Sequence, residues 1–409
     1  MWHSFNHSVA VPAVASACPS TAKSVAHAPV RCAVISDVIH LSNDTGDLFS
    51  QTFAFAQKQV RRLIEKHPQF YPLYTQNGKW VHEGPAWTHW CDGFLPGLMW
   101  IFAKRSDSGT ADQKYWIEHA IRYTKPLEPR KHDRDVHDLG FLFLSTYHRW
   151  YRLTHEHALR DVVAEAGKTL ALRFQEKGQY MRSFVAENSL MIDVMMNVGL
   201  IFYAARELGD RRLRDIAMRT AHTARRVLVR GDGSTAQEGI FDPDTGEFLR
   251  QTTHQGYRGD SCWSRGLAWA LYGFTTCYEY SRDPHFLDTA QSCADFYITH
   301  CPADGVPPWD FNAPVENRTL LDTSAAAICA SGFLRLCRLA PDTLKGHLYW
   351  STAVQILRAL CEKHVAKNDP SWEGVLRGGV YHVHKGLGVD ESVMWGEYFF
   401  VEALERALW

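Results

Sequence analysis

Several motifs that identify large protein classes are missing from this sequence. No run of about 18 apolar residues occurs, so no segment resembles a transmembrane helix. The ten cysteines include no Cys-x-x-Cys pair, which disfavours a zinc site or a thioredoxin-like redox site. Gly-x-Ser-x-Gly, Gly-x-Gly-x-x-Gly and phosphate-loop motifs are also missing. Their absence disfavours an α/β-hydrolase nucleophile and a nucleotide-binding βαβ unit.

The net charge of the chain is small as well. The 44 Lys and Arg residues are balanced by 45 Asp and Glu residues, so a basic surface for nucleic acid is not expected. Hydrophobic residues make up 45% of the chain and charged residues 22%, which is typical of a globular protein. Aromatic residues reach 12%, which suits a large core or a cleft where flat rings pack on sugars. We therefore expect neither nucleic acid nor a membrane as partner.

The cysteines and the N-terminal segment bear on localisation. Several cysteines lie inside helical patterns, where a free thiol behaves as a small apolar core residue, and this favours a reducing, cytoplasmic location. The stretch Val9 to Cys18 faintly resembles an export signal, but Pro12 interrupts it and no Lys or Arg precedes it. We expect residues 1–45 to be poorly ordered or extended, and residues 46–409 to form one catalytic domain.

Helical periodicity recurs twelve times along the chain. The longer connections precede every second helix, and those helices open on motifs rich in Asp, Trp and Arg. Paired helices of this kind predict an all-α fold, an (α/α)6 barrel of six helical hairpins with its pocket at the end where the motifs meet. The predicted helices span residues 48–66, 94–105, 110–125, 139–153, 157–174, 191–208, 211–228, 264–281, 284–299, 321–338, 345–362 and 390–407.

One long connection has a different pattern. Residues 231–252 contain Gly231-Asp232-Gly233-Ser234 and then Phe241-Asp242-Pro243-Asp244-Thr245-Gly246. The second cluster is a strong turn signal between short strand-like pieces. A small β-hairpin is therefore predicted in this loop.

Asp193 and Asp138 are the candidate acids. Asp193 stands in an apolar stretch, and apolar surroundings disfavour the charged form of a carboxylic acid, as a general acid requires. Both residues also open predicted helices, and capping a helix is the simpler interpretation, worth about 0.5–2 kcal/mol. If the two side chains face each other, their like charges keep one carboxyl group protonated.

Arg265 and the tryptophans near it are the candidate ligand-binding residues. An Arg in the first turn of a helix opposes the helix dipole, so Arg265 is expected to hold a ligand carboxylate and to contribute little to folding. Gln255 stands just upstream in a polar loop, and Trp90 lies near Asp92. A buried core position is the alternative for Trp90 and for Trp263.

These motifs, in this order and spacing, resemble those of the unsaturated glucuronyl hydrolases, glycoside hydrolase family 88, over about residues 50–409. The matching segments are Trp-x-Asp-Gly-Phe at 90–94, His-Asp-x-Gly-Phe at 137–141, Ile-Asp-x-Met-x-Asn at 192–197, His-Gln-Gly at 254–256, Trp-x-Arg-Gly at 263–266, Asp-x-Ser-Ala at 322–325, Tyr-His at 381–382 and Trp-Gly-x-Tyr at 395–398.

The resemblance implies hydration of the C4=C5 double bond of a 4,5-unsaturated uronic acid, at the non-reducing end of an oligosaccharide that a lyase has generated. It implies that Asp193 protonates C4 and then accepts the proton of the water added to C5, and that Asp138 assists. It implies no metal and no organic cofactor, and a monomer or homodimer is expected. The residues expected to bind substrate are Trp90, Asp92, Gln237, Gln255, Trp263, Arg265, Trp269, Tyr381 and Lys385.

The chain departs from the family pattern at several positions. Gln237 stands where many members have His, and Leu267 where they have Gln. Members that prefer sulfated saccharides have Ser-x-x-Ser-x-Lys near Tyr-His, and here the positions are Val380, Val383 and Lys385. Replacing hydroxyls by valines removes hydrogen bonds to sulfate, so an unsulfated or differently linked leaving saccharide is expected.

Other functions remain open from the sequence. An unsaturated rhamnogalacturonyl hydrolase would share the fold and the chemistry and differ in substrate. An ordinary glycosidase or a sugar epimerase of the same barrel class is a second alternative. A non-catalytic saccharide-binding barrel is a third, and the changes at Gln237 and Leu267 keep it open.

Overall fold

The computed structural model describes residues 40–81, 89–340 and 342–409, which belong to one compact unit of the chain. The helices are α1 (Asn43–Lys66), α2 (Phe94–Arg105), α3 (Ala111–Thr124), α4 (Leu139–Phe143), α5 (Tyr147–Thr154), α6 (His157–Ala171), α7 (Val194–Leu208), α8 (Arg211–Leu228), α9 (Ser264–Ser281), α10 (Pro284–His300), α11 (Thr323–Leu336), α12 (Thr343–Ala359) and α13 (Met394–Leu408). All twelve predicted helices are present. The expectation for residues 1–45 falls mainly outside the described residues, and the domain boundary stays a prediction.

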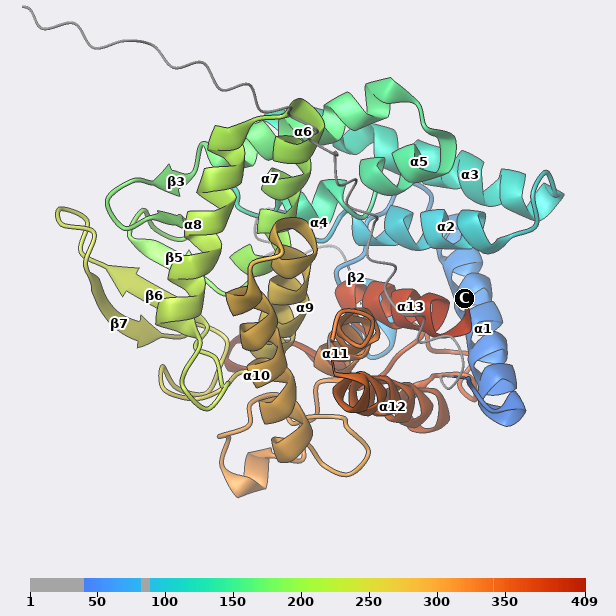
Figure 1. The fold of residues 1–409 in the computed structure, drawn as a ribbon. Coiled ribbons are helices and arrows are strands. Elements are labelled where there is room, and N and C mark those ends of the chain that lie inside the picture. Colours follow the sequence, from blue (N-terminus) through green and yellow to red (C-terminus); the bar gives the residue numbers. More distant parts are fainter. Residues whose placement is uncertain (1–39, 82–88, 341) are drawn as a thin grey trace, which may run out of the picture. The chain divides into compact units, whose positions relative to one another are not determined.

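Six positions around a ring are filled by the helices that open on the motifs (Figure 1). α7 packs on α9, α9 on α11, α11 on α13 and α13 on α2, while α4 and α5 together fill the position between α2 and α7. The remaining helices pair with these from outside, as α3 does with α2 and α12 with α11. The predicted (α/α)6 barrel is confirmed.

The predicted helix 139–153 is broken into α4 and α5. Thr146 leaves helical geometry, with φ −115° and ψ −90°. The hydroxyl of Ser145 donates back to the carbonyl of Phe141, and the hydroxyl of Thr146 donates back to the carbonyl of Leu142. Such bonds compete with the helix ladder and bend it, so the break lies where two hydroxyl residues follow each other.

Short strands decorate the ends of the barrel. They are β1 (Tyr74–Gln76), β2 (Lys79–Val81), β3 (Phe174–Gln175), β4 (Tyr180–Met181), β5 (Ser189–Met191), β6 (Glu238–Phe241), β7 (Phe248–Thr252), β8 (Gly379–His382) and β9 (Leu387–Glu391). The predicted hairpin is confirmed as the antiparallel pair β6–β7, which β5 extends to three strands. Asp242 closes its turn by accepting the N–H groups of Asp244 and Thr245.

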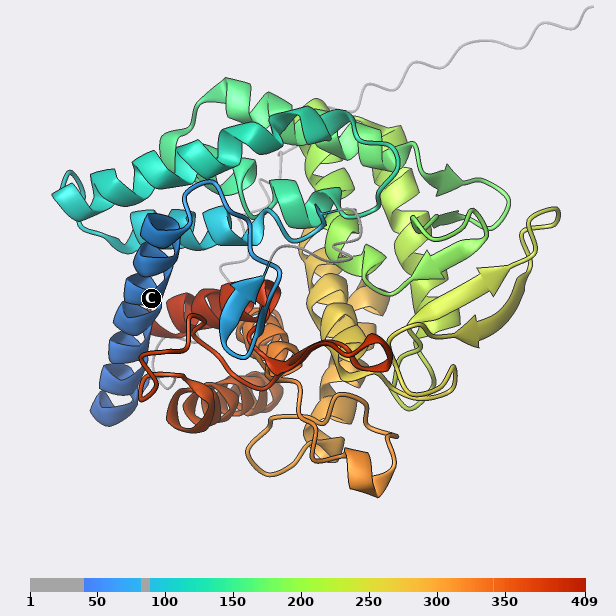
Figure 2. The same ribbon diagram turned by 180° about the vertical axis from the view of Figure 1, so that it is seen from behind.

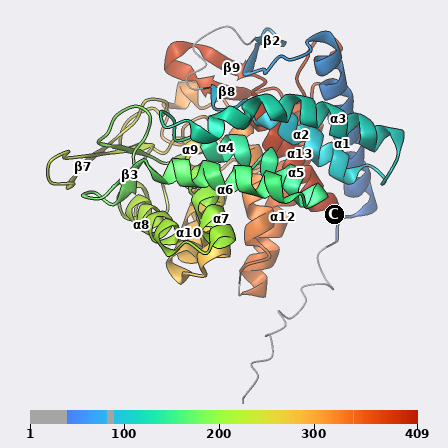
Figure 3. The same cartoon turned by 90° about the horizontal axis from the view of Figure 1, so that it is seen from above.

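The hairpins β1–β2 and β8–β9 were not predicted, because strands of three to five residues carry little periodicity. They lie side by side next to the start of α13 (Figures 2 and 3). The N–H of Thr75 donates to the carbonyl of Ser392 at 2.8 Å, and Tyr74 bridges Val393. Segments that are far apart in the sequence, β1 and the start of α13, thus pair with each other.

Small residues in the motifs allow close helix packing. A methyl group at Gly140 would lie 2.6 Å from Cα of Asn197, so α4 and α7 approach each other only with glycine there. The Asn197 amide then joins the two helices: its oxygen accepts the N–H of Phe141 and its nitrogen donates to the carbonyl of Asp193, both at 3.0 Å. This contact sets the relative position of the segments that carry Asp138 and Asp193.

All eight described cysteines are free thiols, and seven of them are buried, among them Cys277, Cys293, Cys329 and Cys337 inside the predicted helices. Cys18 and Cys32 lie outside the described residues. Among the helices that the structure describes, none has both the length and the apolar surface to span a membrane.

Candidate active site

The predicted site residues come together at the N-terminal ends of the inner helices. Asp138 directly precedes α4, Asp193 directly precedes α7, and Arg265 lies in the first turn of α9. Asp322 precedes α11 in the same way. The barrel therefore gathers at one end the residues that the sequence motifs singled out.

The carboxylates of Asp138 and Asp193 do not cap their helices. Each occupies an N-cap position, but neither side chain accepts a backbone N–H of the first turn. Elsewhere the chain uses aspartate as a conventional cap, with the side chain bonded to the first turn, at Asp210, Asp283, Asp322 and Asp342. Capping, the simpler interpretation from the sequence, therefore does not account for Asp138 and Asp193.

His137 joins these two carboxylates. Its Nε2 lies 3.4 Å from Oδ1 of Asp138 and 3.5 Å from Oδ2 of Asp193. Its Nδ1 accepts the N–H of Phe184 at 2.9 Å, so in the neutral imidazole the proton is held at Nε2, between the carboxylates. Burial lowers the pKa of His137, but the charges of Asp138 and Asp193 outweigh it and raise the pKa above its usual value.

The Oδ1 oxygen of Asp193 makes no hydrogen bond to the described part of the protein. This oxygen is buried, although the side chain as a whole is 23% exposed. An unpaired buried carboxylate oxygen costs free energy unless a ligand or water fills the position. The carboxyl group of Asp193 is thus held by His137 at Oδ2 and is partly exposed, while its buried Oδ1 makes no hydrogen bond to the described residues.

His137, Asp138 and Asp193 also have the spacing of a metal site, with one ligand atom from each within 4.8 Å of the others. The imidazole chemistry does not fit. Because Nδ1 accepts an N–H, Nε2 carries a proton in both the neutral and the charged ring, and it offers no lone pair to a metal. The prediction that the site takes no metal stays a prediction, and this geometry supports it.

Arg265 differs from the expectation drawn from helix dipoles. Its side chain is 1% exposed, and it donates to the carbonyls of Val380 and Tyr381. It also pairs with Asp322 at 3.4 Å, donates to Oε1 of Gln255 at 2.8 Å, and stacks on the Trp263 ring. The expectation that Arg265 contributes little to folding is therefore wrong, because its guanidinium ties α9 to α11 and β8.

The polar loop upstream of α9 is organised by two glutamines. Oε1 of Gln237 accepts Oγ1–H of Thr253 and the N–H groups of His254 and Gln255, at 2.7 to 2.8 Å. Gln237 is 5% exposed, so its carbonyl oxygen builds the loop and is not available to a substrate. Arg265 fixes the amide of Gln255, which leaves the Gln255 NH2 group as a donor for a ligand.

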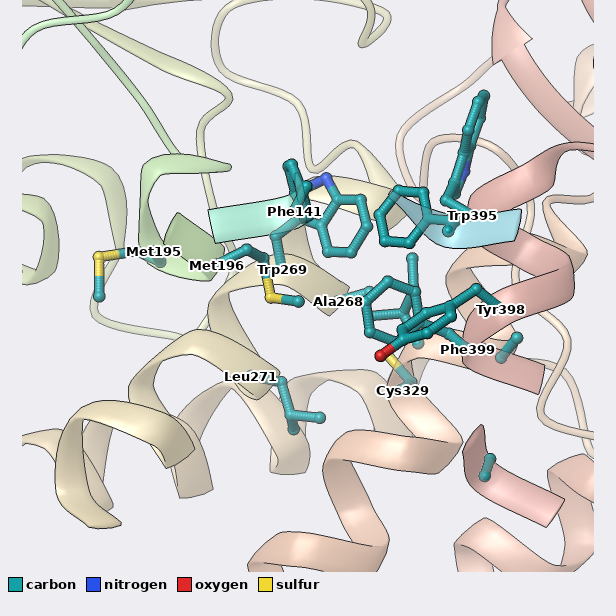
Figure 4. Close-up of a cluster of buried hydrophobic side chains, with 14 of the residues drawn as sticks. Phe141, Met195, Met196, Ala268, Trp269, Leu271, Cys329, Trp395, Tyr398 and Phe399 are labelled. Atoms are coloured by element: carbon teal, nitrogen blue, oxygen red, sulfur yellow. The ribbon is translucent and has the colours of Figure 1, made fainter. Parts of the chain in front are cut away.

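Aromatic rings form the floor of the site. Trp90 is half-buried and packs on Phe141, Tyr381 and Trp395, with ring centroids 5.3, 6.4 and 4.9 Å away. Below them Trp269 packs between Phe141 of α4 and Phe399 of α13 (Figure 4). Trp269 is 2% exposed, and its predicted contact with substrate stays a prediction. It supports the rings that line the site, and Trp90 is the partly exposed ring of this group.

Asp92 has a different environment from the Asp138–Asp193 pair. Burial raises the pKa of Asp92 to about 7, against the opposing charge of Arg130. Its Oδ2 lies 3.7 Å from Nδ1 of His89. The close carboxylate cluster does not include Asp92, and its predicted role in substrate binding stays a prediction.

A charged pair at the edge of the site was missed from the sequence. His254 is exposed, and its Nε2 lies 3.0 Å from Oε2 of buried Glu238. This hydrogen bond raises the pKa of His254. Ser189 donates to the other Glu238 oxygen, so the carboxylate is held from both sides. The β6 strand places Glu238 here, and no motif marks it. Exposed Lys385 follows β8 nearby and acts electrostatically on His254.

Comparison with known proteins agrees with this site. The family model for Glycosyl Hydrolase Family 88 matches residues 61–306. The chain is 33% identical to an unsaturated glucuronyl hydrolase of Bacillus sp. (strain GL1), over 78% of this chain and 86% of that protein. It is 29% identical to an unsaturated chondroitin disaccharide hydrolase of Streptococcus pyogenes serotype M1, over 87% and 90% of the two chains.

The fold has close solved counterparts too. A crystal structure of an unsaturated glucuronyl hydrolase specific for heparin superposes with a TM-score of 0.81 at 29% identity, covering 88% of this chain and 97% of that one. The family resemblance inferred from the motifs is thereby confirmed. With its (α/α)6 barrel and its paired carboxylates at the helix ends, this chain belongs to glycoside hydrolase family 88.

Proposed function

We propose that this chain hydrolyses oligosaccharides that carry a 4,5-unsaturated uronic acid at the non-reducing end. The observation that carries the proposal is the pair Asp138 and Asp193, two carboxylates placed at helix N-termini, withheld from capping and joined by His137. Relatives named as unsaturated glucuronyl and chondroitin disaccharide hydrolases support the substrate class.

In this mechanism the carboxyl group of Asp193 donates its proton to C4 of the unsaturated ring. The Asp193 side chain is 23% exposed, so a substrate can reach its carboxyl group, and Oδ1 has no partner among the described residues that competes for the proton. Positive charge then develops at C5 and the ring oxygen, and water adds to C5. The Asp193 carboxylate accepts the proton that this water releases, so one group serves as acid and then as base.

His137 and Asp138 hold Asp193 ready for this role. The Nε2–H of His137 faces Oδ2 of Asp193 and fixes the orientation of the carboxyl group. Phe184 fixes the ring from the other side through Nδ1. Buried Asp138 lies 3.4 Å from the same Nε2 and so helps to orient the imidazole that faces Asp193.

Hydration then cleaves the substrate without further chemistry by the protein. The hydroxyl at C5 makes a hemiketal, and its C5–O bond to the ring oxygen breaks to leave a ketone. The hemiacetal that remains at C1 collapses to an aldehyde and releases the remaining saccharide as an alcohol. One water is consumed and no atom is oxidised overall, so the reaction needs no redox cofactor.

We assign substrate recognition to side-chain groups that the protein's own hydrogen bonds and ion pairs leave available. Trp90 offers a half-buried ring face to the sugar, and the Gln255 NH2 group donates to its polar atoms. Arg265 acts through Gln255 and β8, because its guanidinium is already bonded there. The N-termini of α4 and α7 add partial positive charge for the uronate carboxylate.

The leaving saccharide is expected to be unsulfated. Val380 is 2% exposed and belongs to the core, and half-buried Val383 is apolar, so neither side chain donates to a sulfate. Lys385 is exposed, and a screened surface charge contributes about 1 kcal/mol or less. A monomer or homodimer and a cytoplasmic location are part of the proposal, and the buried free thiols support a reducing compartment.

The proposal is tested with a panel of lyase-generated disaccharides from chondroitin, heparin and rhamnogalacturonan, each with and without sulfate. Hydration destroys the conjugated C=C–COOH group, so its ultraviolet absorbance should fall with time. Turnover of saturated disaccharides without this change would indicate an ordinary glycosidase. A preference for the rhamnogalacturonan product would favour the rhamnogalacturonyl alternative, and no turnover of any compound would favour a binding protein.

A further inference from the structure

A second cavity lies at the opposite end of the inner helices from Asp193. Its volume is about 540 Å³, which is in the range of small-molecule sites. It is lined by residues of α2, α7 and α9 and the C-terminal end of α11, together with α4, α5 and α13. Nothing in the proposed reaction uses this cavity.

Positive charge dominates the lining. Eight Lys and Arg side chains face three carboxylates, those of Glu279, Glu402 and Glu405. The cationic residues are Lys104, Arg105, Arg149, Arg152, Arg206, Arg335, Arg338 and Arg406. The chain as a whole has a net charge of −1, so this concentration of cations is a local feature of the cavity.

The three carboxylates are already shared. Glu405 bonds Lys104 and Arg105 at 2.8 and 3.0 Å. Glu402 pairs with Arg149 at 2.6 Å and Arg406 at 3.3 Å. It also accepts the hydroxyls of Ser331 and Tyr272, and Glu279 pairs with Arg335. The carboxylates are thus occupied, Arg206 pairs with Glu207 at 2.9 Å, and Arg152 and Arg338 are the lining guanidinium groups left over.

The helix dipole explains part of this pattern. Arg105, Arg206 and Arg335 lie in the last turns of α2, α7 and α11, where cations stabilise the helix ends. The helix dipole accounts for these three arginines but supplies no anion to pair with the other cations of the wall. Exposed Arg152 and Arg338 at the cavity form no ion pair with any carboxylate that the structure describes.

His148 on the cavity wall reports the sign of the local field. Burial and the nearby charges of Arg152 and Arg149 lower the pKa of His148 to about 3. The ring is therefore neutral and leaves the positive charge of the wall unchanged. Burial disfavours a charge of either sign, whereas the contributions of Arg152 and Arg149 show that the electrostatic field of the wall at this ring is positive.

The cavity is separated from the proposed active site by aromatic side chains. Phe141, Tyr398 and Phe399 line it, and they belong to the cluster of buried aromatic side chains in Figure 4. Arg149 donates to the Tyr398 hydroxyl at 2.9 Å and so belongs to the cavity side of this layer. A ligand here would contact neither Asp138 nor Asp193.

From the cavity, its unbalanced guanidinium groups and its separation from the catalytic carboxylates, we infer a second binding site for a small molecule that bears two or more phosphate or sulfate groups. Guanidinium forks match the oxygens of these tetrahedral anions in pairs. Several guanidinium groups around one cavity favour a multivalent anion over a single carboxylate.

The test measures binding of inorganic pyrophosphate and of inorganic sulfate to the whole protein by calorimetry, with chloride at matched ionic strength as the reference. Arg152→Ala/Arg338→Ala removes the two unpaired cations, and their exposure means that the fold is retained, which circular dichroism checks. Binding should weaken at least about tenfold in this variant. Pyrophosphate carries two tetrahedral anionic groups and sulfate one, so the variant should weaken pyrophosphate binding more than sulfate binding.

Two controls separate this site from general charge and from the active site. Arg214→Ala/Arg226→Ala removes two exposed cations of α8 away from the cavity and should leave binding unchanged. Lys385→Ala removes a cation beside the proposed active site and should also leave it unchanged. Equal losses in the control and cavity variants, loss in Lys385→Ala alone, or no binding beyond that of chloride would overturn the inference.

Discussion

Replacing Arg265 by alanine should destabilise the protein strongly. The substitution leaves Asp322, 1% exposed, without its cation, and it removes the donor that serves Val380, Tyr381 and Gln255. Removing one partner of a buried ion pair costs about 3–5 kcal/mol. Asp322 keeps its bonds to the backbone and hydroxyl of Ser324, so we expect the lower end, about 3 kcal/mol.

The loss should also depend on pH. Burial raises the pKa of Asp322, while the neighbouring Arg265 lowers it. Without Arg265 the native carboxyl group keeps a proton that the unfolded chain has already released, so stability falls as pH rises above the usual carboxyl range. The destabilisation should therefore be larger at about pH 8 than at about pH 5.

Urea unfolding of the parent, Arg265→Ala and Arg265→Lys measures these effects through the midpoint and the slope of the transition. Lysine keeps the charge but cannot serve the same set of acceptors, so its loss should be intermediate. A change below about 1 kcal/mol for Arg265→Ala, or a loss that does not vary with pH, would refute the structural role assigned to this residue.

Three further predictions concern single side chains. Burial raises the pKa of Asp92 to about 7, so ionisation of this carboxyl group destabilises the native state as pH rises. The stability of Asp92→Asn relative to the parent should therefore increase from about pH 4 to about pH 8. A difference between the two urea midpoints that does not change with pH would contradict this. Glu238→Gln should lower the pKa of His254, because it removes the partner charge, and NMR titration of the imidazole would show no change if the pair does not form in solution. Gly140→Ala should cost about 1–3 kcal/mol, since its methyl group would press on Asn197, and a neutral effect on thermal unfolding would show that α4 moves freely.

The fold could be predicted from the sequence to a large extent. Helical periodicity is a local property, and every predicted helix is present, with small shifts at the ends. The predicted start of the last helix at 390 is too early, because residues 387–391 form β9 and Asp390 takes a positive φ of 59°. The break between α4 and α5 was missed, since hydroxyl residues that bond back to carbonyls do not alter the apolar pattern.

The site was less predictable, because its chemistry depends on contacts between distant segments. The motifs placed Asp138 and Asp193 at helix starts. They did not show that neither side chain bonds to the first turn of its helix, because this depends on side-chain orientation. His137 lay in a recognised motif, yet its orientation depends on Phe184, far along the chain. Arg265 was misjudged because its partners Val380 and Tyr381 come from a strand that periodicity did not reveal.

The central claim, that Asp193 donates and retrieves the proton, is tested most directly by the absorbance assay on Asp193→Asn. The amide has nearly the same shape but cannot carry the proton, so the decline in absorbance should cease while thermal unfolding stays close to that of the parent. Asp210→Asn is the matched control, because Asp210 caps α8 and asparagine caps equally well, and it should retain full turnover. Turnover by Asp193→Asn within about tenfold of the parent, less than general acid–base catalysis contributes, would contradict the account.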